Sequence, residues 1–212
     1  MTPDSSTNST RLRRVRLLLW VLVALTLLAI AAMFFMHRTP VNVPQAQPAT
    51  VQTSYGGPFT LIGADGKPFP SSRLEGKPYA LYFGYTQCGD VCPTTLQRLV
   101  KLRQAAGGPN ALNIVFITID PANDGPKEVG QYATLFNAPI IGLTGSPAQI
   151  DKVKKQFHIF AQPEPNSHGG MTMINHTATV LLFDRNGQFS GTISSDEPDK
   201  DATAKLKRLT GA

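Results

Sequence analysis

Residues 82–96 read YFGYTQCGDVCPTTL. It begins in an apolar and aromatic run, Tyr79 to Phe83, which predicts a short buried strand. Pro93 suits the first turn of a helix, because proline has no N–H to leave unpaired there. The pattern therefore predicts a strand, a loop and a helix, with Cys88 and Cys92 at or just before the start of the helix.

Cys88 and Cys92 are the two cysteines of the chain. Free amides and the helix dipole at a helix N-terminus favour thiolate over thiol. Residues four apart can come within disulfide range, and the same spacing lets two sulfurs hold one soft ion. A structural disulfide is the weaker explanation, because so small a ring gains little stability from loop closure. The pair indicates redox chemistry or metal binding, and a third metal ligand would be a His or a Met.

Four histidines could complete such a site. His37 lies beside the N-terminal apolar run, His158 ends a predicted helix, and His168 lies in a loop whose role the pattern leaves open. His176 begins a predicted buried strand, Thr177 to Phe183, at a junction where loops meet the sheet. By position alone, a packed or solvated histidine is the commoner case for His176, and a ligand role is the alternative.

Two further pairs of residues carry weaker signals. Met171 and Met173 could form a soft patch for handing on a metal, although packing on a shared strand face is the simpler interpretation. Asp120 and Asp124 follow a predicted strand near the edge of the site. They could attract a cation or a partner, but a turn and helix-cap role is expected first.

Outward from the dithiol segment, periodicity predicts alternating strands and helices. Strand–helix–strand units come early, and an antiparallel hairpin and a helix close the chain. This order favours an α/β fold with a mixed central sheet covered by helices, which is the thioredoxin-like arrangement. The predicted elements are a hairpin at 59–70, helices from Pro93 to 106, at 129–136, from Pro147 to 157 and at 202–209, and strands at 112–119, 140–143, 177–183 and 189–193.

An apolar run from Leu17 to Met36 is interrupted only by Thr26. About 20 helical residues cover the roughly 30 Å hydrocarbon core of a bilayer. Four arginines precede the run, whereas Arg38 alone follows closely, so the N-terminus is predicted to be cytoplasmic and the rest exported. A cleaved signal peptide is the alternative, but the run continues past the cleavage-like Ala29-Ile30-Ala31 and exceeds a usual signal-peptide core.

We therefore predict a cytoplasmic tail at 1–16, a transmembrane anchor at 17–36, a proline-rich linker at 37–55 and a folded domain at 56–212. The tail is too short to hold a mitochondrial transit peptide as well, which favours a bacterial inner membrane and a periplasmic domain. The formal net charge of +6 reflects the arginines flanking the anchor, since positive and negative residues nearly cancel beyond residue 55. This distribution argues against nucleic-acid binding, and nothing indicates more than a monomer.

Three blocks of the sequence resemble the Sco/SenC family of copper-binding proteins involved in cytochrome oxidase assembly. The first and most specific is residues 82–95, the second is Phe116 to Pro121, and the third is Asn175 to Ala178 followed by Leu182-Phe183-Asp184. The resemblance implies that Cys88, Cys92 and His176 bind copper as Cu(I) and also as Cu(II). It further implies a thioredoxin-like fold and, as partner, the copper-accepting subunit of cytochrome c oxidase.

Two departures from the family pattern bear on the site. Gly89 stands where the family usually has proline, which loosens the loop but removes no ligand. Asn175 stands where an aspartate usually precedes the histidine. If that carboxylate orients the ring, copper affinity in this chain differs from that of its relatives.

Three functions are compatible with these residues. The first is a metallochaperone that passes copper to the dinuclear copper site of the oxidase. The second is a thiol–disulfide oxidoreductase that keeps the cysteines of the acceptor reduced, and the third is a redox or copper sensor. We expect the chain to be primarily a metal-binding assembly factor, with thiol–disulfide exchange as a further activity. Peroxide reduction is not favoured, because residues 84–87 lack the usual pattern ahead of a peroxidatic cysteine, and a dedicated thioredoxin would carry C-x-x-C.

Overall fold

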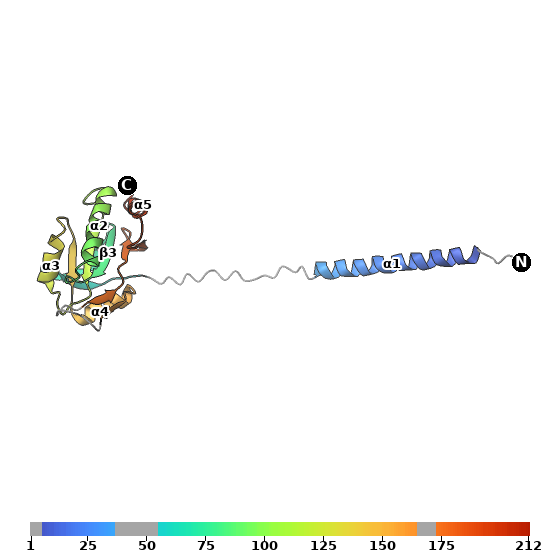
Figure 1. Cartoon of the computed structure of the whole chain (residues 1–212), viewed down its shortest axis with the longest axis horizontal. Coiled ribbons are helices and arrows are strands. Elements are labelled where there is room, and N and C mark those ends of the chain that lie inside the picture. Colours follow the sequence, from blue (N-terminus) through green and yellow to red (C-terminus); the bar gives the residue numbers. More distant parts are fainter. Residues whose placement is uncertain (1–5, 37–54, 165–172) are drawn as a thin grey trace. The chain divides into compact units, whose positions relative to one another are not determined.

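The computed structural model describes residues 6–36, 55–164 and 173–212 (Figure 1). The chain divides into two compact units, residues 1–51 and residues 52–212. The first contains the helix α1 (Ser6–Met36), and the second contains every other described element.

From Leu17 to its end at Met36, the helix α1 is apolar around its whole circumference, apart from Thr26. Its segment Arg16–Met33 has a mean hydropathy of 2.4, and within the described residues α1 is the one helix long and apolar enough to cross a membrane. Thr26, the polar residue in the run, donates its hydroxyl to the carbonyls of Leu22 and Val23, so it presents no unpaired group to a hydrocarbon environment. The helix is compatible with the predicted anchor, although a signal sequence has the same composition and position.

The strands of the second unit are β1 (Thr60–Gly63), β2 (Pro68–Pro70), β3 (Tyr79–Gly84), β4 (Asn113–Thr118), β5 (Ile141–Thr144), β6 (Ala161–Pro163), β7 (Ile174–His176), β8 (Val180–Phe183) and β9 (Phe189–Ile193). Its helices are α2 (Val91–Ala105), α3 (Pro126–Thr134), α4 (Pro147–Gln156) and α5 (Asp199–Thr210), with the 3-10 turn η1 (Ser71–Leu74) after β2.

Seven strands form one sheet in the order β2-β1-β5-β4-β3-β8-β9. The central strands β3, β4 and β5 are parallel, whereas β1 and β8 pair antiparallel on either side of them. The predicted mixed sheet and the thioredoxin-like arrangement are confirmed. Because the carboxyl ends of β3, β4 and β5 lie at one edge, the loops that follow them meet there.

Aromatic side chains fix which helices cover which face of the sheet. Tyr82 and Phe116 are partners in the β3–β4 register, and the Phe116 ring packs 5.1 Å from that of Tyr132 in α3. Phe83 points to the opposite face, since side chains alternate along a strand, and its ring lies 5.7 Å from that of Phe157 at the end of α4. The helices α3 and α4 therefore cover opposite faces.

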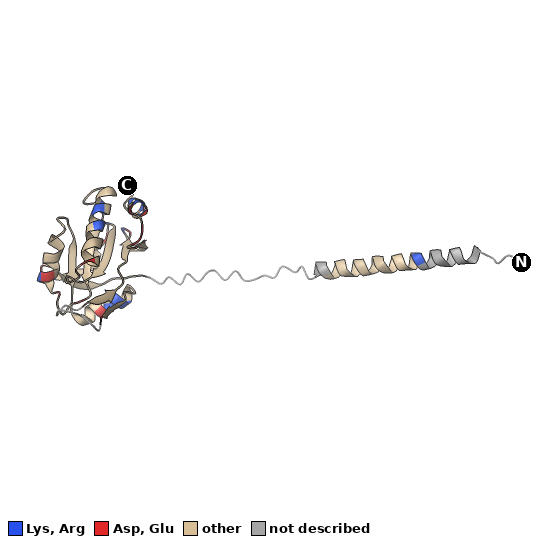
Figure 2. Ribbon diagram, in the orientation of Figure 1, with Lys and Arg blue, Asp and Glu red and all other residues tan. Residues whose placement is uncertain are grey.

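The helix α5 packs beside α2, where Arg98 of α2 binds Asp199 with 2.7 Å between Nε and Oδ1. Lys and Arg share the surface with Asp and Glu, and both signs occur on α3 and on α4 (Figure 2). The helix α2 differs, because it carries Arg98, Lys101 and Arg103 and no acidic residue.

The region around His176 differs from the prediction. His176 ends β7 instead of beginning the buried strand, and that strand starts at Val180, three residues later than predicted. The cause is a second, two-stranded sheet formed by β6 and β7, in which Ala161 pairs with His176. Thr177 continues this pairing, because its N–H donates to the carbonyl of Phe160. The short polar strand β6 has no alternating pattern that could have predicted it.

Candidate metal centre

The three predicted site residues come together at the carboxyl edge of the parallel strands. Cys88 is half-buried in the loop of residues 85–90 that follows β3, and Cys92 is fully buried in the first turn of α2. The Sγ of Cys92 lies 3.6 Å from Nε2 of His176. The Sγ of Cys88 accepts the backbone N–H of Cys92 at 3.4 Å, and the side chains of Cys92 and His176 also bond to it.

The His176 ring is held with one nitrogen toward the sulfurs. Its Nδ1 lies 3.0 Å from the carbonyl oxygen of Thr177, and because a carbonyl can only accept, Nδ1 carries the proton. The other ring nitrogen, Nε2, then faces the Cys92 sulfur, and it is the atom that would bind a metal ion. Tyr82 and Tyr85 pack edge-on against the ring, with centroid distances of 6.3 Å and 6.0 Å. The hydroxyl of Tyr85 also accepts the N–H of Ile174 in β7 at 3.3 Å.

The spacing of Cys92 and His176 fits a shared metal ion. Two ligand atoms bound to one ion at roughly 2.0–2.3 Å, with tetrahedral or trigonal angles, stand about 3.5–3.8 Å apart. The separation of 3.6 Å falls within this range. Among the described His, Cys, Asp and Glu residues, however, no three side chains already form a complete ligand cluster. Cys92 and His176 therefore form a preformed pair of ligands, with the sulfur of Cys88 beside them. Binding of a metal ion would require the Cys88 sulfur to move closer to that pair.

The two thiols differ in acidity. A hydrogen bond from the Cys92 thiol holds the pKa of Cys88 well below its usual range, and bonds from His176 and from the N–H groups of Cys92 and Asp90 add to this, although partial burial opposes it. The pKa of Cys92 is raised, first by the same bond to Cys88 and then by burial. The pair therefore behaves as one thiolate at Cys88 and one retained proton at Cys92.

Cys88 is accordingly expected to react with iodoacetamide at a rate that hardly depends on pH. An ordinary thiol gains about tenfold in rate per pH unit below its pKa of roughly 8.5, because only the thiolate reacts. With a lowered pKa, Cys88 is already ionised, so its rate is expected to stay within about twofold between roughly pH 6 and pH 8. Peptide mass spectrometry checks this, with Cys92 as the slow internal comparison. A tenfold rise per unit at Cys88 would contradict the assignment.

Gly84, at the end of β3, makes room for the sulfur of Cys92. A Cβ at this position would lie 2.9 Å from Cys92 Sγ and 3.0 Å from Cε2 of Phe116. Both neighbours are buried, so neither can move aside freely. The absence of a side chain at residue 84 is therefore part of the construction of the site.

Gly84→Ala is expected to lower the free energy of unfolding by about 1–3 kcal/mol, the usual cost of overpacking a core. Urea unfolding followed by circular dichroism measures this change. Gly89→Ala is the matched control, because a Cβ at residue 89 meets nothing within 4 Å. Equal stability of the two variants would show that the core at Gly84 is loose.

The remaining candidates lie elsewhere. His158 is exposed and packs edge-on against Tyr55 at 5.0 Å, away from the sulfurs. Met173 is exposed and lies just before β7, three residues ahead of His176. The predicted roles of His37, His168 and Met171 fall outside the described residues.

Asp120 and Asp124 behave differently from each other. Asp120 has the expected turn role, since its Oδ2 accepts the side-chain amide of Asn123 at 2.8 Å. The helix-cap role is wrong for Asp124, because the residue that caps α3 is Gly125 and no side chain bonds there. Asp124 is instead buried and bonded to the dithiol loop through Thr86. The sequence pattern predicted that Asp124 follows a strand, but it gave no signal for the hydrogen bond with Thr86.

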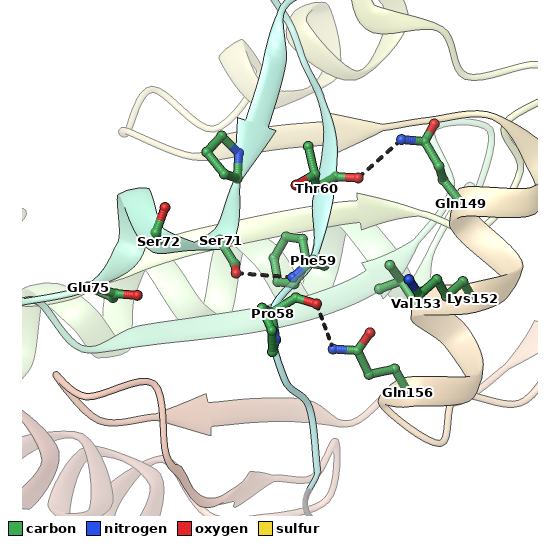
Figure 3. A pocket seen from close by; sticks show the side chains of 11 residues that line it. Pro58, Phe59, Thr60, Ser71, Ser72, Glu75, Gln149, Lys152, Val153 and Gln156 are labelled. Atoms are coloured by element: carbon green, nitrogen blue, oxygen red, sulfur yellow. Dashed lines mark hydrogen bonds between the residues drawn. The ribbon is translucent and has the colours of Figure 1, made fainter.

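A cavity of about 430 Å³ lies between the β1–β2 hairpin and α4 (Figure 3). Gln149 and Gln156 of α4 donate across it to the carbonyls of Thr60 and Pro58. These bonds fasten the chain entering β1 to the helix. No predicted site residue lines this cavity, so it is separate from the thiols.

Comparison with known proteins gives consistent matches. The family model described as SCO1/SenC matches residues 47–211. An SCO2-like protein of Rickettsia prowazekii is 36% identical over 137 residues, covering 63% of this chain and 66% of its own length. The mitochondrial protein SCO2 of Saccharomyces cerevisiae is 33% identical over 155 residues, covering 72% of this chain and 52% of its own length.

The structure of ScoI from Bradyrhizobium japonicum with copper bound is also similar. It is 37% identical, with a TM-score of 0.65, and the match covers 73% of this chain and 98% of that one. Copper, the metal that the sequence resemblance implied, is thus present in a solved relative with this fold. With the family model matching most of its length, the chain belongs to the SCO1/SenC family.

Proposed function

We propose that this chain is a copper metallochaperone that is anchored to a membrane by α1 and serves the dinuclear copper site of cytochrome c oxidase. The observation that carries the proposal is the 3.6 Å approach of Cys92 Sγ and His176 Nε2, with the Cys88 thiolate beside them. Two sulfurs and one imidazole suit Cu(I) and can also hold Cu(II). Support comes from the copper-bound structures of Sco relatives and from the role of the Sco family in cytochrome c oxidase assembly.

Three ligands leave a coordination position open for exchange. An incoming thiolate of the acceptor would bind copper there before a sulfur of this chain departs. Cys88 is the ligand suited to depart first, because it lies half-buried in a loop, whereas Cys92 is fully buried in a helix. Ligand exchange of this kind needs no change in the oxidation state of copper. The site can therefore release copper as well as capture it.

Thiol–disulfide exchange is a second candidate, and the difference in acidity between the two cysteines favours it. The Cys88 thiolate would attack a disulfide of the acceptor and displace one sulfur as a thiolate. Cys92 would lose its proton and attack the mixed disulfide, releasing the second sulfur of the acceptor. Two electrons pass to the acceptor, and Cys88 and Cys92 end as a disulfide. Such a step would prepare the thiols of the acceptor for copper.

The membrane topology belongs to the same proposal. The arginines before α1 favour a cytoplasmic N-terminus. The unit of residues 52–212 would then lie in the periplasm of a bacterium, tethered to the inner membrane by a single span. Copper and the exported copper subunit of the oxidase would both be within its reach.

Transfer from the copper-loaded chain to the apo copper subunit tests the proposal. Copper is expected to move to the subunit when the thiols of the subunit are already reduced. Copper that stays on the chain, while a subunit disulfide becomes reduced, would favour the second candidate. If neither copper nor electrons move, the proposed partner is wrong. Loss of oxidase activity on gene deletion, restored by added copper, is the corresponding result in cells.

A further inference from the structure

Three threonines, at or just after the carboxyl ends of three adjacent parallel strands, donate hydrogen bonds to Asp124. Its Oδ2 accepts the hydroxyl of Thr118, at the end of β4, at 2.6 Å. Its backbone carbonyl accepts the hydroxyl of Thr144, at the end of β5, at 2.6 Å. Thr86 follows β3 and donates twice, with its N–H to Oδ2 at 2.9 Å and with its hydroxyl to Oδ1. Asp124 thus joins the carboxyl ends of the three central strands.

Asp124 depends on these donors because it is 1% exposed. Among the described residues, no Lys, Arg or His forms an ion pair with it. A buried carboxylate without a cation is costly unless hydrogen bonds replace its lost water. Thr86 supplies two of the three bonds to the carboxylate, so the buried group and the loop that bears Thr86 hold each other in place.

Thr86 lies two residues before Cys88, inside the loop whose conformation places that sulfur. The loop closes in a tight turn, where the N–H of Cys88 donates to the carbonyl of Tyr85 at 3.2 Å. The hydroxyl of Tyr85 accepts from Ile174 in β7, the strand that ends at His176. One residue of the loop is therefore fastened to the histidine strand, and the next is fastened to Asp124.

We propose that Asp124 is a positioning residue that fixes the Cys88 loop, through Thr86, against the Cys92–His176 pair. The part of this inference that concerns copper affinity rests on the proposed function. Cys88 is the one member of the donor set that lies outside a helix or strand, so its sulfur depends most on loop contacts. Catalytic and binding groups must be held within about 0.5 Å of the productive geometry by such supporting bonds. Without the anchor, the Cys88 sulfur would move away from the ion and from the backbone N–H of Cys92, whose hydrogen bond it accepts.

Thr86→Val tests the link, because valine keeps the shape and the N–H but removes the hydroxyl that binds Oδ1. We expect Cu(I) affinity of the full chain in detergent, measured by competition with a chromogenic chelator, to fall about 10–100-fold, as when the outer partner of a ligand is lost. Asp124→Asn is expected to act in the same direction, since its NH₂ would face a donor. Thr86→Ser keeps the hydroxyl and should restore binding to within about threefold of the original chain.

Thr144→Val is the matched control, because it removes a bond to the backbone carbonyl of Asp124 and leaves the three bonds to the Asp124 carboxylate in place. It is expected to lower stability while leaving copper affinity and the sulfur-to-copper absorption bands of the Cu(II) form unchanged. If Thr86→Val folds and binds copper like the original chain, the positioning role is overturned. Equal loss of affinity in Thr86→Val and Thr144→Val would also overturn it, since the role would then be general stability. Should Asp124→Asn fail to fold, the Thr86 series decides alone.

The alkylation rate of Cys88 at about pH 6 separates failure of this inference from failure of the proposed function, because it needs no copper. A displaced loop carries the Cys88 sulfur away from the Cys92 thiol and from the Cys92 N–H that it accepts, so the alkylation rate should fall in Thr86→Val and recover in Thr86→Ser. If the original chain binds no copper but this pattern holds, the proposed function is wrong and the positioning role stands. An unchanged rate in Thr86→Val overturns the positioning role.

Discussion

Replacing His176 with alanine is expected to lower copper affinity by more than about 100-fold, because loss of a ligand should exceed the 10–100-fold cost of losing the outer partner of a ligand. The imidazole contributes the nitrogen that lies 3.6 Å from the Cys92 sulfur. Two sulfurs would remain, and they are a weaker site for either oxidation state of copper. Competition with a chromogenic chelator measures the change, and circular dichroism confirms that the variant folds.

His158→Asn is the control for this prediction. His158 is exposed and has a φ of 53°, a left-handed conformation that asparagine tolerates better than alanine. Its copper affinity is expected to match that of the original chain within about twofold, since ordinary surface substitutions have small effects. If His176→Ala bound copper as tightly as His158→Asn, the imidazole would not be a ligand and the three-ligand site would be wrong.

The two cysteines are expected to give opposite results when each is replaced by alanine and the protein is mixed with oxidised glutathione. Cys92→Ala keeps the half-buried Cys88 sulfur, which would attack and remain trapped as a mixed disulfide because no second thiol is present to release it. Cys88→Ala keeps only the Cys92 sulfur, which loses its bond to Cys88 but stays fully buried, and burial both favours the protonated thiol and keeps it out of reach of glutathione. Intact-mass measurement detects the added glutathione.

Both cysteine variants are expected to lose copper binding by more than about 100-fold, since each lacks a thiolate ligand. Glutathione adducts and copper affinity together separate thiol–disulfide exchange from copper binding. Cys92→Ala should still form the mixed disulfide, whereas neither variant should still bind copper. A glutathione adduct on Cys88→Ala and none on Cys92→Ala would reverse the assignment of the attacking sulfur.

Much of the fold was predictable because the strands of the central sheet are strongly apolar. The runs at Tyr79 to Phe83 and Leu112 to Ile119 matched β3 and β4 to within a residue or so. Ser146-Pro147 opened α4 as predicted, and Ser146 accepts the N–H of Gln149 in a capping box. These signals are local, since each depends on the neighbours of a residue along the chain.

The site was predictable only in part, because its remaining contacts are long-range. Position alone did not favour His176 as a ligand, since the β6–β7 pairing that brings it to Cys92 joins segments with little periodicity. The resemblance to a family supplied that residue. Asp124 was assigned a local cap role, whereas its contacts depend on the register of three strands. Register cannot be read from any one of those strands.

X-ray absorption on the copper-loaded chain, reduced to Cu(I), tests the central claim most directly. We expect two sulfur ligands and one nitrogen ligand, with the multiple-scattering pattern of an imidazole that disappears in His176→Ala. Bond lengths of roughly 2.0 Å to nitrogen and 2.3 Å to sulfur would agree with the separation of 3.6 Å between Cys92 Sγ and His176 Nε2. A copper site with sulfur ligands alone, identical in the original chain and in His176→Ala, would contradict the account.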